Sequence, residues 1–326
     1  MIKKKKKINK NINFLFKNRD LFNKFKNDFN KHYSEEEEAI RYKIFSDNVK
    51  MINKHNSEEH NYKLGINGFT DLTNAEYQSL YLRPMEIPDL EIETVDASGL
   101  TDTPSSYDCR NYGEVTPVKN QNPCGSCWSF SATGVIEGCG KIGSGKLNSV
   151  SEQELVDCDD DDNGCSGGWP KRALDWVKNN GGICSESAYP YQAVQGTCKK
   201  TSCSSVSTVG SAYYATPNNP EVLKSVIYTY GPVSVAIDAS STQFSNYRGG
   251  VFDYPSCGTA VNHAVLVVGY GHDYSVGLDY WIIKNSWGTS WWGAAGYMNM
   301  KRTNANDAGM CGILQYPVFA TGCTAH

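Results

Sequence analysis

Apolar and polar residues near the start of the chain follow a helical spacing. Phe22, Phe25 and Phe29 recur at intervals of three and four residues. Further on, the acidic run Glu35–Glu38 suits the first turn of a helix, because carboxylates are stabilised at the positive end of the helix dipole. Together these patterns predict helical structure over residues 22–60.

A stripe of mixed chemistry runs along this predicted helix. At steps of three and four residues it combines charged, amide and apolar side chains: Glu37, Arg41, Phe45, Asn48, Ile52 and Asn56. Residues at this spacing share one helical face, and a face so mixed predicts packing through ion pairs and hydrogen bonds. The following segment, Tyr62–Asp71, alternates polar and apolar residues, which predicts a short strand.

The pattern changes twice more along the chain. From Pro84 to Thr103 the segment is rich in proline and acidic residues and has no period, which predicts an extended linker. Helical spacing then predicts three helices and a tight turn: Cys124–Lys141, Gln153–Asp157, Lys171–Asn179 and the turn Gly164–Gly168. After about residue 206 the β-branched and aromatic runs predict strands: Pro232–Ile237, Ala264–Gly269 and Tyr280–Lys284. A helical half followed by a β half predicts an α+β body with a cleft between the halves.

Composition narrows the class of protein. The 326 residues are 40% hydrophobic with a net charge of −4, which indicates folded domains and argues against a nucleic-acid or membrane-surface role. All twelve cysteines follow residue 108, which favours disulfides in an oxidising compartment over the alternative of a zinc protein. We find no apolar run long enough to span a membrane. The lysine-rich start resembles the charged part of a signal peptide but lacks the apolar core.

The segment Cys124-Gly-Ser-Cys127-Trp leads directly into a helical pattern. A CxxC pair alone allows a redox couple, half a zinc site, or a structural cysteine beside a reactive one. Cys127 would begin the helix, where the dipole stabilises a thiolate. A nucleophilic thiolate needs a base and a group that orients the base. His263, before an apolar strand, and Asn285, in Asn-Ser-Trp287-Gly, are candidates, although a lone histidine there is by default a core residue.

These residues and their order resemble the papain/cathepsin family of cysteine proteases. The similarity covers residues 104–326 and extends through Gln121, the Gly167-Gly168 pair, Tyr247–Gly250 and Gly269–Gly271. The stripe described above completes the ERFNIN pattern of cathepsin-L-like propeptides. Gly65, Asn67, Phe69 and Asp71 complete the GxNxFxD motif of the same propeptides.

The resemblance implies a papain-like two-lobed fold, with a helical lobe and a β-barrel-like lobe. It divides the chain into a leader at 1–21, a mainly helical inhibitory propeptide at 22–102 and a peptidase domain at 103–326. Cys127 would be the nucleophile and His263 its partner in a thiolate–imidazolium pair. Asn285 would orient the imidazole under the shield of Trp287, and Gln121 would donate to the oxyanion. No cofactor or metal is implied.

Substrate contacts are implied in the same way. Gly167 and Gly168 would lie along the substrate backbone. The pocket for the side chain two residues before the cut (S2) would be lined by Trp169, Pro170, Ala236, Val261 and Ala264, and would prefer apolar residues. Asn262 and Trp287 would be further substrate contacts. The segment after Cys311 that normally forms the floor of this pocket is about three residues short, so the sequence does not identify the floor.

The family's disulfides correspond to Cys124–Cys165, Cys158–Cys198 and Cys257–Cys311. Cys184 and Cys203 flank the Tyr189–Tyr191 loop and are a candidate fourth pair. Cys109 stands where the family usually has tryptophan, which implies a packing gap or a new bridge, and the odd number of remaining cysteines leaves at least one without an internal partner. Trp292 is a single inserted residue. The run Asp159–Asp162 is interpreted as a solvated turn, with a calcium site as the alternative.

The resulting hypothesis is a monomeric endopeptidase zymogen, lysosomal, vacuolar or secreted. Its expected partners are protein and peptide substrates, its own propeptide and cystatin-like inhibitors. The propeptide would run backwards through the cleft and be removed near residues 100–103. The alternatives are a non-catalytic homologue and a thiol–disulfide exchanger that uses Cys124 and Cys127.

Overall fold

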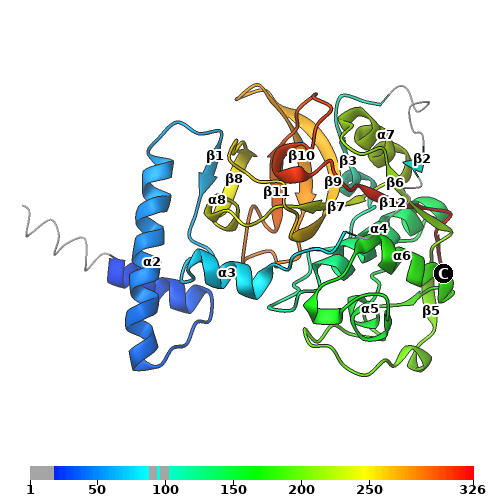
Figure 1. The fold of residues 1–326 in the computed structure, drawn as a ribbon, viewed down its shortest axis with the longest axis horizontal. Coiled ribbons are helices and arrows are strands. Elements are labelled where there is room, and N and C mark those ends of the chain that lie inside the picture. The colour runs from blue at the N-terminus through cyan, green and yellow to red at the C-terminus, as the bar shows by residue number, and fades with distance from the viewer. Residues whose placement is uncertain (1–17, 88–93, 96–102) are drawn as a thin grey trace, which may run out of the picture.

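The computed structural model describes residues 18–87, 94–95 and 103–326. From residue 103 onward the protein has a helical lobe and a lobe built on β-sheet, so the predicted α+β two-lobed body is confirmed (Figure 1). The first lobe contains the three predicted helices, α4 (Cys127–Ser144), α5 (Glu152–Cys158) and α6 (Pro170–Asn179). Helix α4 begins at Cys127 rather than at the predicted Cys124, because residues 124–126 form the turn that leads into it.

A ten-stranded sheet extends through the second lobe in the order β1-β8-β11-β10-β9-β7-β12-β6-β2, with β3 paired to β9. Its strands after the propeptide are β3 (Tyr107–Asp108), β6 (Ser211–Ala215), β7 (Val233–Ile237), β8 (Tyr247–Phe252), β9 (His263–Asp273), β10 (Leu278–Lys284), β11 (Tyr297–Lys301) and β12 (Val318–Thr321). The described strands form no closed barrel. A smaller sheet joins β13 (Thr324–Ala325), β5 (Ser205–Thr208) and β4 (Ile183–Cys184).

The core lies where α4 packs on β9. Residues 127–140 of α4 are buried, and so are the first nine residues of β9. A Cβ atom at Gly134 would meet the side chain of Leu266 in β9, so glycine lets the helix approach the strand closely. Helix α7 (Pro220–Tyr230) covers the sheet in the half that was predicted to be mainly β, and the helix α8 (Thr242–Ser245) lies there as well. The sequence pattern missed α7, although Asn219 caps it and Pro220 begins it.

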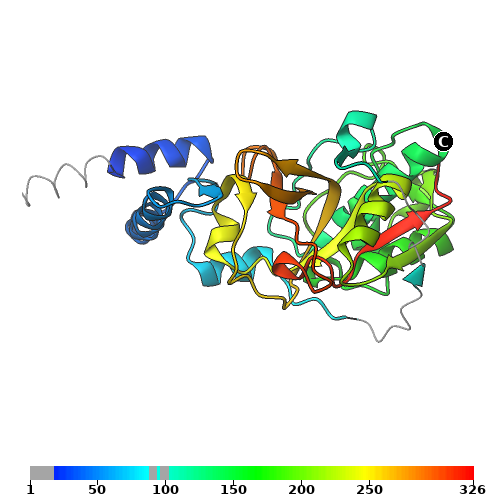
Figure 2. The same cartoon turned by 90° about the horizontal axis from the view of Figure 1, so that it is seen from above.

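The propeptide is helical over most of residues 22–60, as predicted, and this stretch consists of two helices. One helix spans residues 18–28, the chain turns, and α2 (Glu35–Asn56) crosses it (Figure 2). The Ser34 hydroxyl accepts a hydrogen bond from the backbone N–H of Glu37, so α2 begins at the predicted acidic run. Buried Phe22, Phe25, Phe45 and Val49 hold the two helices together.

The mixed stripe on α2 packs through polar contacts, as predicted. The Arg41 guanidinium lies 3.2 Å from the Glu37 carboxylate and 2.9 Å from that of Glu76 in α3 (Asn74–Tyr81). The side-chain amides of Asn48 and Asn56 donate to backbone carbonyls in the segment that follows the helix. These bonds tie α2 to the chain around the GxNxFxD motif.

The expected strand over Tyr62–Asp71 is much shorter than predicted. Strand β1 covers only Tyr62–Leu64, because Asn67 and Thr70 then close a turn through the hydrogen bond from the Asn67 N–H to the Thr70 hydroxyl. Strand β1 pairs antiparallel with β8 of the body. Within the predicted linker, β2 (Thr94–Val95) pairs parallel with β6. The propeptide therefore adds a strand at each end of the main sheet.

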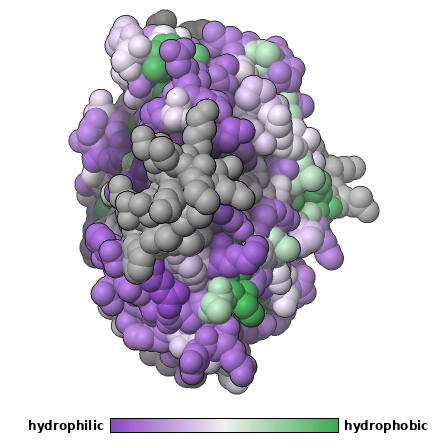
Figure 3. Space-filling model, turned by 90° about the vertical axis from the view of Figure 1, so that its left-hand side faces the viewer, coloured by the Kyte–Doolittle hydropathy of each residue, from purple (hydrophilic) through white to green (hydrophobic). Residues whose placement is uncertain are grey.

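The outer face of the propeptide, seen end-on, is mainly hydrophilic, with a few isolated hydrophobic side chains (Figure 3). In the part of the chain that the structure describes, no helix is long and apolar enough to cross a membrane.

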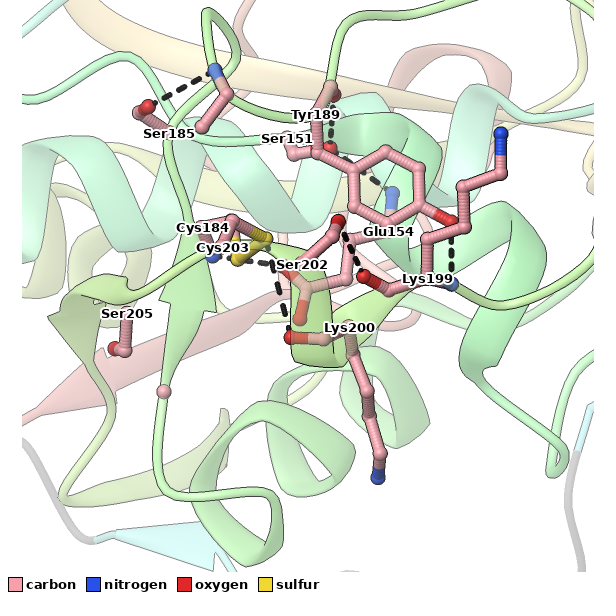
Figure 4. Close-up of a disulfide and its surroundings, with 12 residues drawn as sticks. Ser151, Glu154, Cys184, Ser185, Tyr189, Lys199, Lys200, Ser202, Cys203 and Ser205 are labelled. Atoms are coloured by element: carbon pink, nitrogen blue, oxygen red, sulfur yellow. Dashed lines mark hydrogen bonds between the residues drawn. A yellow bond between two sulfur atoms is a disulfide. The ribbon is translucent and has the colours of Figure 1, made fainter.

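Five disulfides cross-link the body. The three pairs implied by the family resemblance are formed: Cys124–Cys165, Cys158–Cys198 and Cys257–Cys311. The candidate pair Cys184–Cys203 is formed as well (Figure 4), and Cys139–Cys323 ties the C-terminal end to α4. Cys109 makes no new bridge; it is a buried free thiol within hydrogen-bonding reach of the Glu114 carboxyl.

Removing the two disulfides that the family pattern does not supply should have unequal effects on stability. The Cys139–Cys323 pair spans 184 residues and the Cys184–Cys203 pair spans 19. Because a longer loop gains more entropy in the unfolded chain when it is released, we expect C139S/C323S to lose about 1–2 kcal/mol more unfolding free energy than C184S/C203S. Urea denaturation without reductant measures both. An equal loss would contradict the loop-length explanation.

Candidate active site

The predicted nucleophile lies where the two lobes meet. Cys127 is the first residue of α4, is 3% exposed and is not disulfide-bonded. Its Sγ accepts a hydrogen bond of 3.4 Å from the backbone N–H of Ala264, the second residue of β9. The thiol therefore lies at a helix N-terminus, and the strand that carries His263 lies against it.

His263, the first residue of β9, is fully buried, and the residue that follows it, Ala264, donates to the Cys127 thiol. Nε2 of His263 lies 2.8 Å from Oδ1 of Asn285. Since that oxygen can only accept, Nε2 carries the hydrogen and Nδ1 holds the free lone pair. Nδ1 has no hydrogen-bond partner among the described residues. The indole of Trp287 stacks on the imidazole, with ring centroids 4.7 Å apart, as a shield over the contact with Asn285.

Gln121 is held rigidly next to the nucleophile. Its Nε2 donates to the backbone carbonyl of Cys124 at 2.9 Å, and its Oε1 accepts from the hydroxyl of Ser286 at 2.5 Å. Its own backbone carbonyl accepts from the Tyr191 hydroxyl at 2.8 Å. The second N–H of the Gln121 side-chain amide remains available to donate a hydrogen bond. The sequence did not identify Tyr191 and Ser286 as supports, because their contact with Gln121 exists only in the folded chain.

Burial governs the protonation of this site while the propeptide is in place. Removal from water raises the pKa of the Cys127 thiol to about 11, and the backbone N–H of Ala264 and the nearby charge of Arg83 offset this only in part. Removal from water likewise lowers the pKa of His263 to about 4, despite the hydrogen bond to Asn285. Both groups are therefore neutral near pH 7 in the covered site.

The predicted glycine pair lies beside the nucleophile helix. Gly167 has φ 122°, which side-chain-bearing residues rarely adopt, and a Cβ atom at Gly168 would meet the ring of Trp128. Trp169 and Pro170 follow at the start of α6, both buried. The Trp169 indole N–H donates to the Tyr214 hydroxyl at 2.7 Å, and its ring meets that of Tyr316 edge-on at 5.4 Å. Tyr316, from the shortened segment, is thus a neighbour of this wall.

The opposite wall comes from β7, β9 and the residues before β9. Ala236 pairs with Ala264 across the two strands, and Val261 and Asn262 come next to them. The Asn262 side-chain oxygen accepts from the backbone N–H of Ala239 at 2.9 Å, which fixes that side chain in place. The pocket residues implied by the resemblance therefore lie on three segments, residues 169–170, β7 and residues 261–264. The first follows Gly168, which contacts Trp128, and the last contacts Cys127, so both lie at the start of α4.

A propeptide segment that the sequence did not single out occupies this site. The Arg83 N–H donates to the Asn262 carbonyl at 3.1 Å, and the Met85 N–H to the Val261 carbonyl at 3.4 Å. The Arg83 side chain lies against Gly125, two residues before the nucleophile. No local signal marks these residues, because they stand at the start of the aperiodic segment.

Propeptide aromatic residues also surround the Trp287 shield. Phe69, Tyr77 and Tyr81 meet its indole at centroid distances of 5.0–6.2 Å. Next to it, Trp291 contacts Phe29 and lies under the Lys31 ammonium at 5.0 Å. The inserted Trp292 is buried against Phe244 and donates to the carbonyl of Phe244.

Of the acidic and cysteine clusters outside this site, the acidic one differs from its prediction. The predicted solvated turn Asp159–Asp162 is exposed only at Asp160 and Asp161; Asp159 and Asp162 are buried, and Asp162 pairs with Arg172 at 2.6 Å. Glu154 lies close to Cys184 and Cys203, but the disulfide between the two cysteines removes them as metal ligands (Figure 4).

Comparison with known proteins agrees with this geometry. The papain family cysteine protease profile matches residues 103–321, and the cathepsin propeptide inhibitor domain profile matches residues 22–77. Fruit bromelain of Ananas comosus is 42% identical over 307 residues, which are 92% of this chain and 85% of that protein. Chymopapain of Carica papaya is 42% identical over 299 residues, which are 90% and 84% of the two chains.

Solved proenzymes share the whole arrangement. A recombinant stem bromelain precursor superposes with a TM-score of 0.86 at 39% identity, covering 93% of this chain and 98% of that one. Digestive procathepsin L2 of Tenebrio molitor gives 0.85 at 38% identity, covering 93% and 99%. The fold and site define a cysteine protease with its inhibitory propeptide in place, a zymogen. The chain belongs to the papain family and has a cathepsin-type propeptide.

Substitution of Gly68 should weaken the binding of the propeptide to the rest of the protein. A Cβ atom at Gly68 would overlap the Trp291 indole, whereas one at Gly249 in β8 would meet nothing within 4 Å. Overpacking of this kind costs about 1–3 kcal/mol, so we expect G68A to react with a thiol-directed probe at neutral pH about tenfold faster than the unaltered zymogen. G249A is the matched control, and equal rates for G68A and G249A would contradict this account of docking.

Proposed function

We propose that the chain is an endopeptidase in which Cys127 and His263 act as nucleophile and proton carrier. The observation that carries the proposal is the free Nδ1 of His263, whose ring is oriented by the bond between Nε2 and Asn285 and whose neighbour Ala264 donates to the free Cys127 thiol. A redox role for the CxxC pair is less compatible with the chain, since Cys124 is bonded to Cys165.

The reaction would follow from these contacts. The Cys127 thiol gives its proton to Nδ1 of His263, and the sulfur attacks the carbonyl carbon of the scissile bond. The oxyanion that forms accepts from the Cys127 backbone N–H and the remaining N–H of Gln121; loss of one such donor costs ~3 kcal/mol of transition-state stabilisation. His263 protonates the leaving amine, and a water molecule then releases the acid and restores the thiol. Asn285 and the Trp287 shield keep the imidazole oriented throughout.

The thiolate–imidazolium pair would form only once the propeptide has left. Burial disfavours both charged forms, and the propeptide segment at Arg83 and Met85 lies over this site. Release of Arg83 and its neighbours would return water to the cleft. The charged pair would then be favoured by the dipole at the start of α4.

Substrate binding would use the segments described above. The backbone beside Gly167 and Gly168 would bind the substrate main chain. An S2 pocket of Trp169, Pro170, Ala236, Val261 and Ala264 would prefer apolar side chains, and Asn262 and Trp287 would be further substrate contacts. Tyr316 is a reasonable candidate for its floor, because it contacts Trp169.

Activation would require cleavage near residues 100–103, between a propeptide at 22–102 and an enzyme at 103–326. A lysosomal, vacuolar or secreted location, a monomeric mature enzyme and sensitivity to cystatin-like inhibitors remain part of the proposal. The five disulfides support an oxidising compartment.

Labelling of the thiol tests the assignment of the nucleophile. We expect an epoxide or iodoacetamide probe to modify the processed enzyme stoichiometrically at Cys127, because Cys109 is buried and the other cysteines are disulfide-bonded. C127A should lose labelling, self-processing and peptidase activity, and C109S should keep all three. A C127A chain that still cleaves peptides would refute the proposal.

Acid should promote self-processing. A hydrogen bond from Lys26 lowers the pKa of Glu38, and hydrogen bonds from Thr73 and Arg41 lower the pKa of Glu76 although burial opposes them. Lowered carboxyl pKa values stabilise the folded propeptide above the ordinary value of about 4.3, and this stabilisation is lost as the pH falls through the lower folded values. We therefore expect processing to stay slow from pH 7.5 down to about 5 and to accelerate as the pH falls through about 4.

Time courses on denaturing gels would measure this processing. E76Q, which cannot ionise at residue 76, should be processed at a higher pH than the unaltered chain, and C127A should stay intact. A chain that is cut at pH 7.5 and remains uncut at pH 4–5 would overturn the acid mechanism.

A further inference from the structure

Two buried carboxyl groups lie in the segment that precedes the glycine pair, and one of them, Asp162, lies against Gly168. Asp159 ends α5, and Asp162 stands just before the turn at Gly164–Ser166. Asp159 is 4% exposed and Asp162 is 7% exposed, whereas Asp160 and Asp161 between them face solvent. Carboxyl groups are rarely buried to this extent unless each charge is paired, so the pair calls for a physical explanation.

Asp162 is attached to the segment proposed to bind substrate. Its Oδ1 accepts from the backbone N–H of Trp169 at 2.9 Å. The same oxygen accepts from Nε of Arg172 at 2.8 Å, and Nη2 of Arg172 lies 2.6 Å away. A Cβ atom at Gly168 would come within 2.8 Å of the Asp162 carboxyl carbon. The carboxylate thus lies directly beneath the peptide that joins Gly168 to Trp169 and fixes its orientation.

The remaining oxygens of the pair face no donor. Arg172 and Trp169 both donate to Oδ1 of Asp162, which leaves Oδ2 buried without a partner. Oδ2 of Asp159 is also buried without a partner, while its Oδ1 accepts from the Asp161 N–H at 3.1 Å. Each side chain influences the pKa of the other, so the two carboxyl groups are close neighbours. A single proton held between the two Oδ2 atoms would satisfy both.

Charge supports a shared proton. Two carboxyl groups with one proton carry a single negative charge, which the Arg172 guanidinium balances. Burial, and then the neighbouring Asp162 charge, raise the pKa of Asp159 to about 7, and burial raises that of Asp162 against the pull of Arg172. Asp161 adds repulsion from the solvent side. In the zymogen, Glu86 of the propeptide lines the same open hollow as Asp162 and adds a further negative charge there.

Loss of the proton would leave two adjacent buried carboxylates with one guanidinium. The hollow beside them, lined by Asn163, Ser166 and Gln195, gives Asp162 a path to water. An Asp162 side chain that turned into this hollow would release the Trp169 N–H. The contacts described for Cys127, His263 and Asn285 include neither aspartate, so chemistry at the thiol would be unaffected.

We propose that Asp162, clamped by Arg172 and sharing one proton with Asp159, is a positioning residue that holds the Gly168–Trp169 backbone in the form that binds substrate. Substrate affinity then falls when the pair loses its proton. This inference rests on the proposed endopeptidase function, since it concerns that enzyme's substrate-binding wall.

The test compares processed wild-type enzyme, D159N and D160N over pH 5.5–8.5, with a peptide substrate that has an apolar residue two positions before the cut. We expect the wild-type KM to rise about tenfold between pH 6 and pH 8.5, the effect of losing one hydrogen bond to a charged group. In D159N the amide N–H donates permanently to Asp162, so KM should stay level with pH. D160N changes an exposed residue of the same turn and should follow wild type, and the pH profile of kcat should be the same in all three.

A second arm tests the clamp. D162N should raise KM about tenfold at every pH, because it leaves Arg172 without its counter-charge and weakens the acceptor for Trp169. R172K should restore more affinity than R172M. If these variants fail to fold, the comparison of D159N with D160N still decides the question, since D159N keeps the hydrogen bond.

Three outcomes would overturn the inference. In the first, the KM of D159N changes with pH as the wild-type KM does. In the second, pH changes kcat and leaves KM unchanged. In the third, calcium at pH 8 raises substrate affinity and EDTA reverses the rise, which would mean that a cation rather than a proton is held between the two carboxyl groups. Titration of the thiol with an epoxide probe separates this failure from that of the proposed function. A wild-type enzyme that titrates fully and hydrolyses peptide, with none of the expected KM changes, refutes only the role of Asp162.

Discussion

The hydrogen bond from the Ala264 N–H to the Cys127 sulfur is the contact on which the site depends, because it joins a helix of one lobe to a strand of the other. The surrounding structure fixes this contact. Gly134 allows α4 to lie close to Leu266, and the Ser131 hydroxyl donates to the Val265 carbonyl at 2.7 Å. Small residues on one face of α4 therefore position the thiol against the start of β9.

A buried ionic network beneath this contact sets how the lobes fit together. The Lys119 ammonium lies 3.1 Å from the Glu137 carboxylate and 2.6 Å from that of Glu152. Lys284, from β10, donates to the Thr116 hydroxyl, which donates to Glu137 at 2.5 Å. Burying such charges is costly unless the partners are aligned, so a shifted packing of the lobes would leave charges unpaired. The network favours the one arrangement in which the thiol and imidazole lie together.

The sequence predicted those helices and strands whose signal comes from residues that are neighbours in the chain. The helix at Cys127, the acidic start of α2 and the strand after His263 each follow from neighbouring residues, and the resemblance assigned most of the site. Helix α7 was not predicted because its β-branched residues suit a strand as well as the buried face of a helix. Packing against the sheet decides between these two structures. The burial of Asp159 and Asp162 was not predicted for a related reason. An acidic run indicates exposure to solvent unless a basic partner is known, and Arg172 becomes that partner only when α6 forms.

Inhibition and catalysis share the same side chains. Trp287 shields the imidazole from one side and packs against Phe69, Tyr77 and Tyr81 of the propeptide on the other. The propeptide therefore does more than block the entry of substrate. It adds three aromatic rings around the shield, while burial raises the pKa of Cys127 and lowers that of His263, which disfavours the charged form of each. The propeptide thus covers both the Trp287 shield and the residues that it binds through Arg83 and Met85, so its release exposes both together.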